Sequence, residues 1–516
     1  MTEDITAPTP ERALASAAAG LTWGHLPPHV VDAVRRLFLD WVASALAGSR
    51  SIQVTRLMQA AARGGLGIGG SPRAEGEKGT ATALPRFAQA PPLVAAMLNG
   101  ASSHVEEMDD LHNESIYHPG TCVFPAALAV AESEGAGPRD FLTAAVAGYE
   151  VSLRVGQALG SEHYRYFHTT GTAGTVGAAV AAGHLLGLDT EGMLSAIGSA
   201  GTQAAGLWQF LADGAMSKQL HAAKAAFNGV LSAYLADEGF TGSAEILFGE
   251  KGLLPGTARG EATAGITDDR ALRRHQRQAV MEGVEEVQGS PSPTYGFAAF
   301  KTPEVSIKYH ASCRHTHPAV DALLLTMEDH GLVAEQIRRI HAHVNTAAFD
   351  LLKDATATTP WAAKFSIPFC LAQAALSGSL GVDSFSDSAL ADPGLAELMS
   401  KVTTRVDPSL DADYPRRWAA WVDVETVSGS TFQARVDAPK GDPDNALSAE
   451  DLEAKFRLLS HRVLDDESVG RLLAMLATLT DLGRMSDLFK GIATPGEETA
   501  PPVLDRAADS RPRGIP

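Results

Sequence analysis

Cysteine is almost absent from this chain, with only Cys122, Cys313 and Cys370 among 516 residues. Three scattered cysteines cannot build a disulfide framework, so we expect a protein of the reducing cytoplasm. Basic residues are also few, since 42 Lys and Arg stand against 61 Asp and Glu and leave a net charge of −19. That charge opposes binding to nucleic acid and to anionic membranes. We therefore expect neither as a partner.

Long apolar runs and targeting features are missing as well. No apolar stretch is long enough to span a bilayer, and the acidic start "MTEDITAPTPERALASAAAG" has no basic region before an apolar one, which argues against a secretory signal. No repeat has a solenoid period. What remains is a chain of 54.0 kDa, long enough for two domains with a polar pocket between them.

Helical patterns fill the first half of the chain. "DFLTAAVAGYEVSLRVGQALG" has apolar residues at helical spacing, with Asp140 as the expected N-cap. "MSKQLHAAKAAFNGVLSAYLADEGFTG" has the same pattern and stops at Gly239. The glycine-dense residues 63–84 are expected to form a flexible connection. This region predicts a helical bundle.

The pattern changes after about residue 301. "RIHAHV" alternates apolar residues with histidines, as a half-buried strand does, and "WVDVETVSGSTFQARVDAP" alternates on both sides of a Ser-Gly-Ser turn, as a hairpin does. Helix returns in "SAEDLEAKFRLLSHRVLD", where Ser448 is the expected cap. A smaller α+β domain is therefore expected between the bundle and the last helices.

The stretch "HVEEMDDLHNESIYHPG" gathers carboxylates and imidazoles and permits three interpretations. A metal site would need several of them to converge on one ion. A polar loop would use the acids to cap the helix that starts near Phe124. Acid/base chemistry would need a buried imidazole held by a carboxylate, a role that Asp109 or Asp110 can fill for His118. The residues concerned are Glu106, Glu107, Asp109, Asp110, His112 and His118.

Two further stretches offer chemistry in the helical half. "YFHTTGTAGTVGAAVAAGHLLG" places His168 before a helix whose start can bind an anion, but its small residues also suit close helix packing, which we favour for this stretch taken alone. It fits no nucleotide-binding motif. In "AMSKQLHAAKAAF", Lys218, His221 and Lys224 recur every three residues along a helix, either as a solvated stripe or, in a cleft, to bind a carboxylate.

The last candidate stretch is "VSIKYHASCRHTHPAVDALL". Zinc is conceivable, but one cysteine among irregularly spaced histidines is far from a zinc motif. Lys308 and Arg314 fit better as a cationic patch for carboxylates. Cys313 as a nucleophile has no support, since a free cysteine is most often simply buried.

Together these motifs resemble the MmgE/PrpD family, which includes 2-methylcitrate dehydratase, cis-aconitate decarboxylase and iminodisuccinate epimerase. The resemblance rests on "LNGASSHVEEMDDLHNESIYHPGTCVFPAALAVAE", "FHTTGTAGTVGAAVAAGHLLGL", "MSKQLHAAKAAFNGVLSAYLADEGFTG", "IKYHASCRHTHPAVDA", "KFSIPFCLAQAALSG" and "LSAEDLEAKF", in family order from about residue 14 to 492. It implies a mainly α fold, with a large helical domain built from both chain ends and a smaller α+β lid. The expected division is 8–300 (helical), 301–443 (lid), 444–495 (helical) and 496–516 (disordered tail).

The resemblance also implies a homodimer, a site between the domains, and no metal or organic cofactor. Carried over motif by motif, the catalytic positions are His118, His168, Lys218 and Lys308. Substrate contacts are expected from Glu107, Asp109, Asp110, His112, Arg314 and Phe369.

Three positions depart from the decarboxylase pattern. Glu107 stands for an aspartate, Leu111 for a threonine and Phe369 for a tyrosine. The loss of a hydroxyl and a phenol removes two hydrogen-bond donors, so we expect a substrate other than cis-aconitate, with Arg314 gripping an extra carboxylate.

The family chemistry creates a carbanion-like centre beside a carboxylate, which Lys218 and Lys308 would stabilise while His118 and His168 move protons. We favour the dehydration of a hydroxy di- or tricarboxylate, as in 2-methylcitrate dehydratase, because it needs only a base and an acid. Epimerisation comes second and decarboxylation third. A non-catalytic carboxylate-binding protein and a metal-dependent hydrolase are the rivals from other classes.

Overall fold

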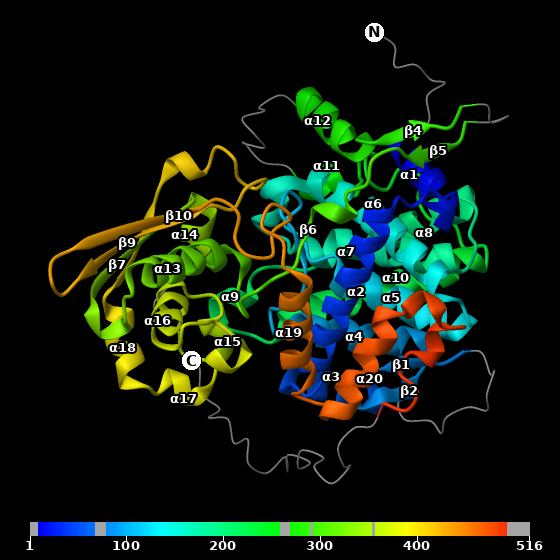
Figure 1. The fold of residues 1–516 in the computed structure, drawn as a ribbon. Coiled ribbons are helices and arrows are strands. Elements are labelled where there is room, and N and C mark those ends of the chain that lie inside the picture. The colour runs from blue at the N-terminus through cyan, green and yellow to red at the C-terminus, as the bar shows by residue number, and fades with distance from the viewer. Residues whose placement is uncertain (1–8, 68–78, 259–268, 289–292, 353–356, 493–516) are drawn as a thin grey trace, which may run out of the picture.

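The computed structural model describes residues 9–67, 79–258, 269–288, 293–352 and 357–492. Helices dominate these residues, which confirms the predicted mainly α fold. Figure 1 shows a large helical lobe beside a smaller lobe that carries a sheet. Residues 68–78 of the predicted flexible connection at 63–84 lie outside the described residues, as does the predicted disordered tail. The described ends of that connection include the last residue of α3 (Ile52–Arg63) and the strand β1 (Ala81–Ala83).

The large lobe is built from both chain ends. Its elements are α1 (Pro10–Ala19), α2 (Pro28–Gly48), α3 (Ile52–Arg63), β1 (Ala81–Ala83), β2 (Ala88–Ala90), α4 (Pro92–Val105), β3 (Leu111–His112), α5 (Gly120–Glu134), α6 (Pro138–Tyr164), α7 (Thr169–Leu185), α8 (Thr190–Gly201), α9 (Phe210–Asp213), α10 (Ser217–Asp237), α11 (Leu253–Thr257), α12 (Asp269–Met281), β4 (Val284–Glu286), β5 (Tyr295–Phe297), β6 (Val305–Ser306), α19 (Ala449–Ser460) and α20 (Asp466–Ala477).

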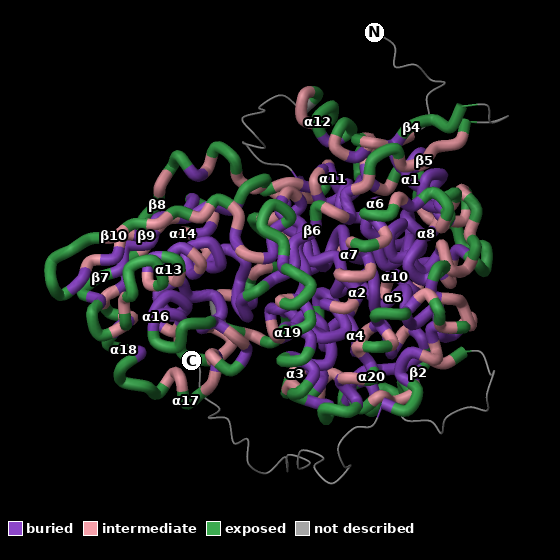
Figure 2. The backbone as a smooth tube through the Cα atoms, in the orientation of Figure 1, coloured by how far each residue is buried: buried purple, intermediate pink, exposed green. Residues whose placement is uncertain are grey.

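Helix α7 is the centre of this lobe and contacts α5, α6 and α10. Its small residues allow that proximity. A Cβ at Gly177 would lie 2.7 Å from the Cβ of Ser152 on α6, and a Cβ at Gly229 on α10 would lie 2.3 Å from the Cβ of Ala178. Real side chains do not approach so closely, so both positions require glycine. The small residues of α7 therefore serve close helix packing. Figure 2 shows the interior around α7 as buried.

The smaller lobe contains a four-stranded sheet in the order β10-β9-β7-β8, in which only the β7/β8 pair is parallel. Helix α13 packs across β9 and β10, and α16 packs against α13 and β8. The elements of this lobe are α13 (His317–His330), β7 (Ile337–Val344), α14 (Thr346–Leu352), α15 (Pro360–Ala363), α16 (Ile367–Ser377), α17 (Asp387–Leu390), α18 (Pro393–Ser400), β8 (Val402–Val406), β9 (Ala420–Thr426) and β10 (Thr431–Val436).

The predicted strands and the last helices are confirmed. "RIHAHV" lies within β7, and the predicted hairpin is β9 and β10, with Gly429 at φ 89° in its turn. Ser448 caps α19 through a capping box with Asp451. Figure 1 shows α19 beside α2, and Arg36 of α2 donates to the Leu447 carbonyl just before α19.

One capping prediction was wrong. Helix α6 begins at Pro138 with Gly137 as its N-cap, so Asp140 lies in the first turn and does not cap the helix. Proline suits the first helical position, because it has no N–H to lose and its φ is already helical.

Two findings bear on the predictions from composition. No helix among the described residues combines the length and apolarity needed to cross a membrane. The three cysteines are free and buried.

Candidate active site

A two-stranded ribbon brings the acidic stretch next to Lys308. Strand β3 pairs with β6 in antiparallel register, with Leu111 opposite Ser306 and His112 opposite Val305. The same register, extended by two residues, sets Asp109 opposite Lys308. Segments almost 200 residues apart in sequence therefore meet, with a carboxylate facing an ammonium.

Glu107 is the carboxylate at the centre of the site, and it bridges two lysines. It follows α4 with φ 58° and accepts from Lys218 Nζ and, at 3.1 Å, from Lys308 Nζ. Glu107, Lys218 and Lys308 are each at most 2% exposed. Burial alone would raise the pKa of Glu107, but the two ammonium groups outweigh it and lower that pKa. The strained backbone, which costs about 1 kcal/mol or more, is thus held by two buried ion pairs.

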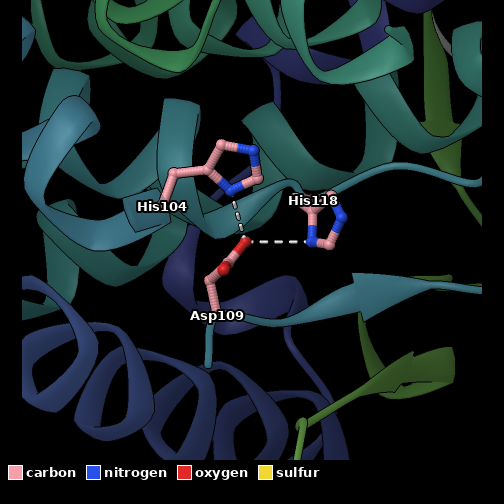
Figure 3. Close-up of side chains that lie close together, drawn as sticks. All are labelled: His104, Asp109 and His118. Carbon is pink, nitrogen blue, oxygen red and sulfur yellow. Dashed lines mark hydrogen bonds and ion pairs between the residues drawn. The ribbon is translucent and has the colours of Figure 1, made fainter. Parts of the chain in front are cut away.

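Asp109 holds two histidines with one oxygen. Its Oδ2 lies 2.9 Å from Nδ1 of His104 and 2.9 Å from Nδ1 of His118, as Figure 3 shows. His118 Nδ1 also lies 2.7 Å from the Asp110 carbonyl oxygen. A carbonyl oxygen only accepts, so Nδ1 of His118 carries the proton. The other nitrogen, Nε2, points away from Asp109 and is left as a base.

The histidines around Asp109 form a stack of rings. The centroid of His104 lies 5.0 Å from that of His118 and 5.4 Å from that of His168, which is nearly parallel to it. His168 also packs on Trp208, and its Nδ1 lies 3.2 Å from Nδ1 of His221. One nitrogen of that pair must donate and the other must accept, so the two rings take opposite tautomers.

His118, His168 and His221 are neutral at pH 7, because each has a lowered pKa. Burial lowers the pKa of His118 to about 4, and Lys308 adds to this while Asp109 opposes it. Burial, followed by the nearby His104 and His221, holds the pKa of His168 well below its ordinary value. The pKa of Asp109 also lies well below its ordinary value, because its interactions with His104, Lys308 and His118 outweigh its burial. The site thus combines two ammonium groups, two carboxylates and neutral bases.

The metal interpretation can be tested on the same atoms. Ligand atoms of His104, Asp109 and His118 lie within 4.8 Å of one another, a spacing that a metal ion can bridge. However, both Nδ1 atoms already face Asp109 Oδ2, and Lys308 Nζ lies 3.9 Å from Asp109 Oδ1. A divalent ion there would sit beside a buried ammonium group, which it repels. The donor set suits hydrogen bonding better than metal binding.

Two predicted substrate contacts hold the local backbone. Asp110 accepts from the backbone N–H of Gly120, the first residue of α5, and from the Tyr149 hydroxyl at 2.6 Å. Burial raises the pKa of Asp110 to about 8. His112 contacts Ser115 through Nδ1 and Glu304 through Nε2. The capping interpretation of the acidic stretch therefore holds for Asp110, although the helix begins at Gly120 and not near Phe124.

Arg314 and Phe369 make their contacts elsewhere. The Arg314 guanidinium pairs with Asp442 at 3.1 Å and is 1% exposed. Phe369 is fully buried and stacks on Phe385 of the smaller lobe. These contacts do not bring either side chain to the cluster around Glu107, so their role in substrate binding stays a prediction.

A cavity of about 700 Å³ opens beside the loop 412–416 of the smaller lobe. Its lining includes Glu114, Gln157, His275, Tyr414 and Arg416. The cluster around Glu107 is not part of its lining. The chemistry defines the site better than the empty volume does, because the titratable groups converge at the cluster.

Sequence reasoning passed over His104 and Lys455. His104 lies in the last turn of α4 and is fully buried, five residues before the Asp109 that it contacts. Lys455 stands between Leu452 and Phe456, both buried. A lysine on the apolar face of a helix was a signal for a buried charge that needs partners.

The helical lobe, the smaller α+β lobe and this buried cluster of lysines, carboxylates and imidazoles define the chain as an enzyme. The chain belongs to the MmgE/PrpD family, because the sequence models of the MmgE/PrpD N-terminal and C-terminal domains match residues 12–264 and 310–481. This confirms the resemblance that the motifs gave.

Curated relatives match 78% or more of this chain at low identity. Cis-aconitate decarboxylase of Aspergillus terreus is 27% identical over 496 residues, which are 92% of this chain and 94% of the relative. Cis-aconitate decarboxylase of Homo sapiens is 25% identical over 515 residues, 96% and 97% of the two chains. The protein of the same name from Mus musculus is 26% identical over 415 residues, 78% and 79%.

Proposed function

We propose that this protein is a lyase that removes water from a small hydroxy di- or tricarboxylate by proton transfer beside a carboxylate. The observation that carries the proposal is the pair of buried ammonium groups, Lys218 and Lys308, on one carboxylate, with a neutral imidazole next to them. Cations placed where negative charge develops stabilise an enediolate.

In the proposed mechanism, His118 is the base. Its Nδ1 proton is held by the Asp110 carbonyl and Asp109, so Nε2 takes the proton from the carbon next to the substrate carboxylate. The C–H electrons become the enediolate, whose charge lies on oxygens near Lys218 and Lys308. The enediolate then expels the hydroxyl group from the neighbouring carbon.

The departing hydroxyl needs a proton to leave as water, and His168 can supply it. We assign the donor in the His168–His221 pair to His221 Nδ1, so that His168 Nδ1 is the acceptor. His168 then carries its own proton on Nε2. Opposite tautomers at His118 and His168 thus give the site one base and one donor.

Decarboxylation of a cis-aconitate-like acid is the second candidate, and the names of the relatives favour it. The lysines would stabilise the same kind of anion after CO₂ leaves. The unprotonated Nε2 of His118 favours dehydration, because dehydration begins with the removal of a proton from carbon, whereas decarboxylation begins with the loss of CO₂. Leu111 and Phe369, which depart from the decarboxylase pattern, point the same way. The homodimer, the cytoplasmic location and the four-part domain division stay predictions.

The test is a panel of acids, namely 2-methylcitrate, citrate, cis-aconitate, iminodisuccinate, malates and tartrates, followed by proton NMR in D₂O with EDTA. We expect water loss or deuterium uptake with one acid, abolished by Lys218→Ala and retained by Lys401→Ala, a matched change in a surface pair with Glu397. Loss of CO₂ would favour decarboxylation. Inversion at carbon without net loss would favour epimerisation, and turnover seen only in a parallel sample without EDTA would favour a metal enzyme. Binding without turnover by the whole panel would contradict the proposal and favour a carboxylate-binding protein.

A further inference from the structure

Another buried lysine lies behind the site, with three acceptors around its ammonium group. Lys455 of α19 is 5% exposed, and its Nζ donates to the carbonyl oxygens of Met108 at 2.7 Å and Lys308 at 2.6 Å. The same Nζ pairs at 2.5 Å with Asp40 of α2, which is 1% exposed. An ammonium group has three N–H donors, and three acceptors surround this one.

The two carbonyls belong to the segments that carry the charged side chains. Met108 lies between Glu107 and Asp109, and the second carbonyl is that of Lys308 itself. The β3/β6 ribbon has its last paired residues at Leu111 and Ser306. Beyond the ladder, Lys455 joins the two backbones and takes the place of the next inter-strand hydrogen bonds.

The separation of the charged side chains depends on this link. Lys308 Nζ lies 3.1 Å from Glu107 Oε2 and 3.9 Å from Asp109 Oδ1, and both distances cross from one joined segment to the other. If the two backbones part by about 1 Å, such geometry is lost, at a cost on the order of 10²-fold in rate. Lys455 contacts backbone oxygens and Asp40, and not the side chains of Glu107, Asp109 or Lys308.

We infer that Lys455 is a positioning residue, whose ammonium group fixes the Glu107–Asp109 turn against Lys308 and so makes turnover depend on the C-terminal helix α19. The inference rests on the proposed function for its activity readout. It assigns α19, which is distant in sequence from the other site residues, a role in the reaction.

The difficulty in testing it is that Lys455→Met alone leaves Asp40 buried without its partner, which destabilises the fold whatever Lys455 does for the site. The double variant Lys455→Met with Asp40→Asn removes both charges and is expected to restore most of the melting temperature. Lys401→Met is the matched surface control.

We expect the double variant to have a normal melting temperature and a kcat about 10- to 100-fold lower, with KM changed less, because the reacting groups are present but misplaced. Lys401→Met should match the wild-type protein. If the double variant recovers activity together with stability, Lys455 is only structural and the inference is wrong.

A second readout needs no substrate and separates this inference from the proposed function. The titration of His118, followed by histidine NMR, depends on both Asp109 and Lys308. Its midpoint should shift in the double variant and not in Lys401→Met, even if the wild-type protein turns over none of the acids. An unchanged midpoint in the double variant would contradict the positioning role by itself.

Discussion

Residues 104–118 and residues 310–321 each contain three histidines among charged side chains, but they use these groups differently. In the first stretch Glu107 is satisfied by Lys218 and Lys308, which come from other elements. In the second stretch His310 pairs with Asp321 at 2.6 Å, and the other groups also find fixed partners in or near the smaller lobe.

The difference teaches that a density of titratable residues does not make a site. Charges that are paired where they stand hold the fold together, while charges that converge from several elements, beside neutral bases, can act on a substrate. Five expected results would sharpen this comparison or break it.

The largest effect is expected from His118→Gln. Removing a general base typically costs about 10²- to 10⁴-fold in rate. In the wild-type protein kcat/KM should fall as the pH drops through about 4, because His118 works as a base only when it is unprotonated. Steady-state kinetics across pH check both points, and a variant that keeps the same acidic limb would assign the base to another group.

Lys308→Ala should lower kcat/KM by about 10²- to 10³-fold, as expected when one stabilising donor is lost from a developing anion. The folded fraction, measured by circular dichroism, corrects for any loss of stability. Equal activity per folded molecule would remove Lys308 from the mechanism.

Arg314→Met should show the opposite pattern. Breaking its buried pair with Asp442 is expected to lower the free energy of unfolding by about 3–5 kcal/mol. Turnover per folded molecule should stay within a few-fold of the wild-type value. A selective rise in KM with unchanged stability would instead support the predicted role of Arg314 in substrate binding.

Acid should destabilise both regions. Burial lowers the pKa of His118 to about 4 and that of His315 to about 3, so the folded state binds fewer protons than the unfolded state below pH 6.5. Stability therefore falls as the pH drops from 6.5 towards 4, by roughly 2 kcal/mol per histidine at pH 5. Urea unfolding at pH 7, 6 and 5 measures this slope. His315→Gln should flatten the slope, and an unchanged slope would show that His315 does not contribute.

The smallest effect is expected from Phe369→Tyr. The ring is fully buried against Phe385, so an added hydroxyl finds an apolar surrounding and costs about 1–3 kcal/mol of stability. Activity on cis-aconitate should not appear. If it does, the hydroxyl reaches the substrate, and the position is part of the site.

Local patterns predicted the elements well, because they depend on neighbours in the sequence. The alternation in β7, the hairpin at Gly429 and the Ser448 cap follow from short-range periodicity and turn chemistry. The predicted cap of α6 was wrong, because Asp140 and Pro138 are both favourable near a helix start and lie within one turn of each other.

Long-range pairing could not be predicted in the same way. The motifs identified Glu107, Lys218 and Lys308 as site residues. They did not predict that the Glu107 carboxylate bridges both lysines, because this contact depends on the register of β3 with β6 and on the position of α10. The sequence also left Asp109 and Asp110 interchangeable. Both are buried, and their neighbours separate them, because Asp109 is held ionised by His104 and Lys308 while burial raises the pKa of Asp110 to about 8.

The bridge at Glu107 has a consequence for how a substrate arrives. A carboxylate that binds Lys218 or Lys308 does not meet a bare cation, because Glu107 already occupies both. Docking is therefore an exchange of one carboxylate for another, and its affinity is the difference between two similar ion pairs. A bound substrate carboxylate gains little binding free energy from that exchange, whereas the more concentrated charge of an enediolate gains more. Competition with Glu107 therefore makes the lysines selective for the reacting state over the substrate.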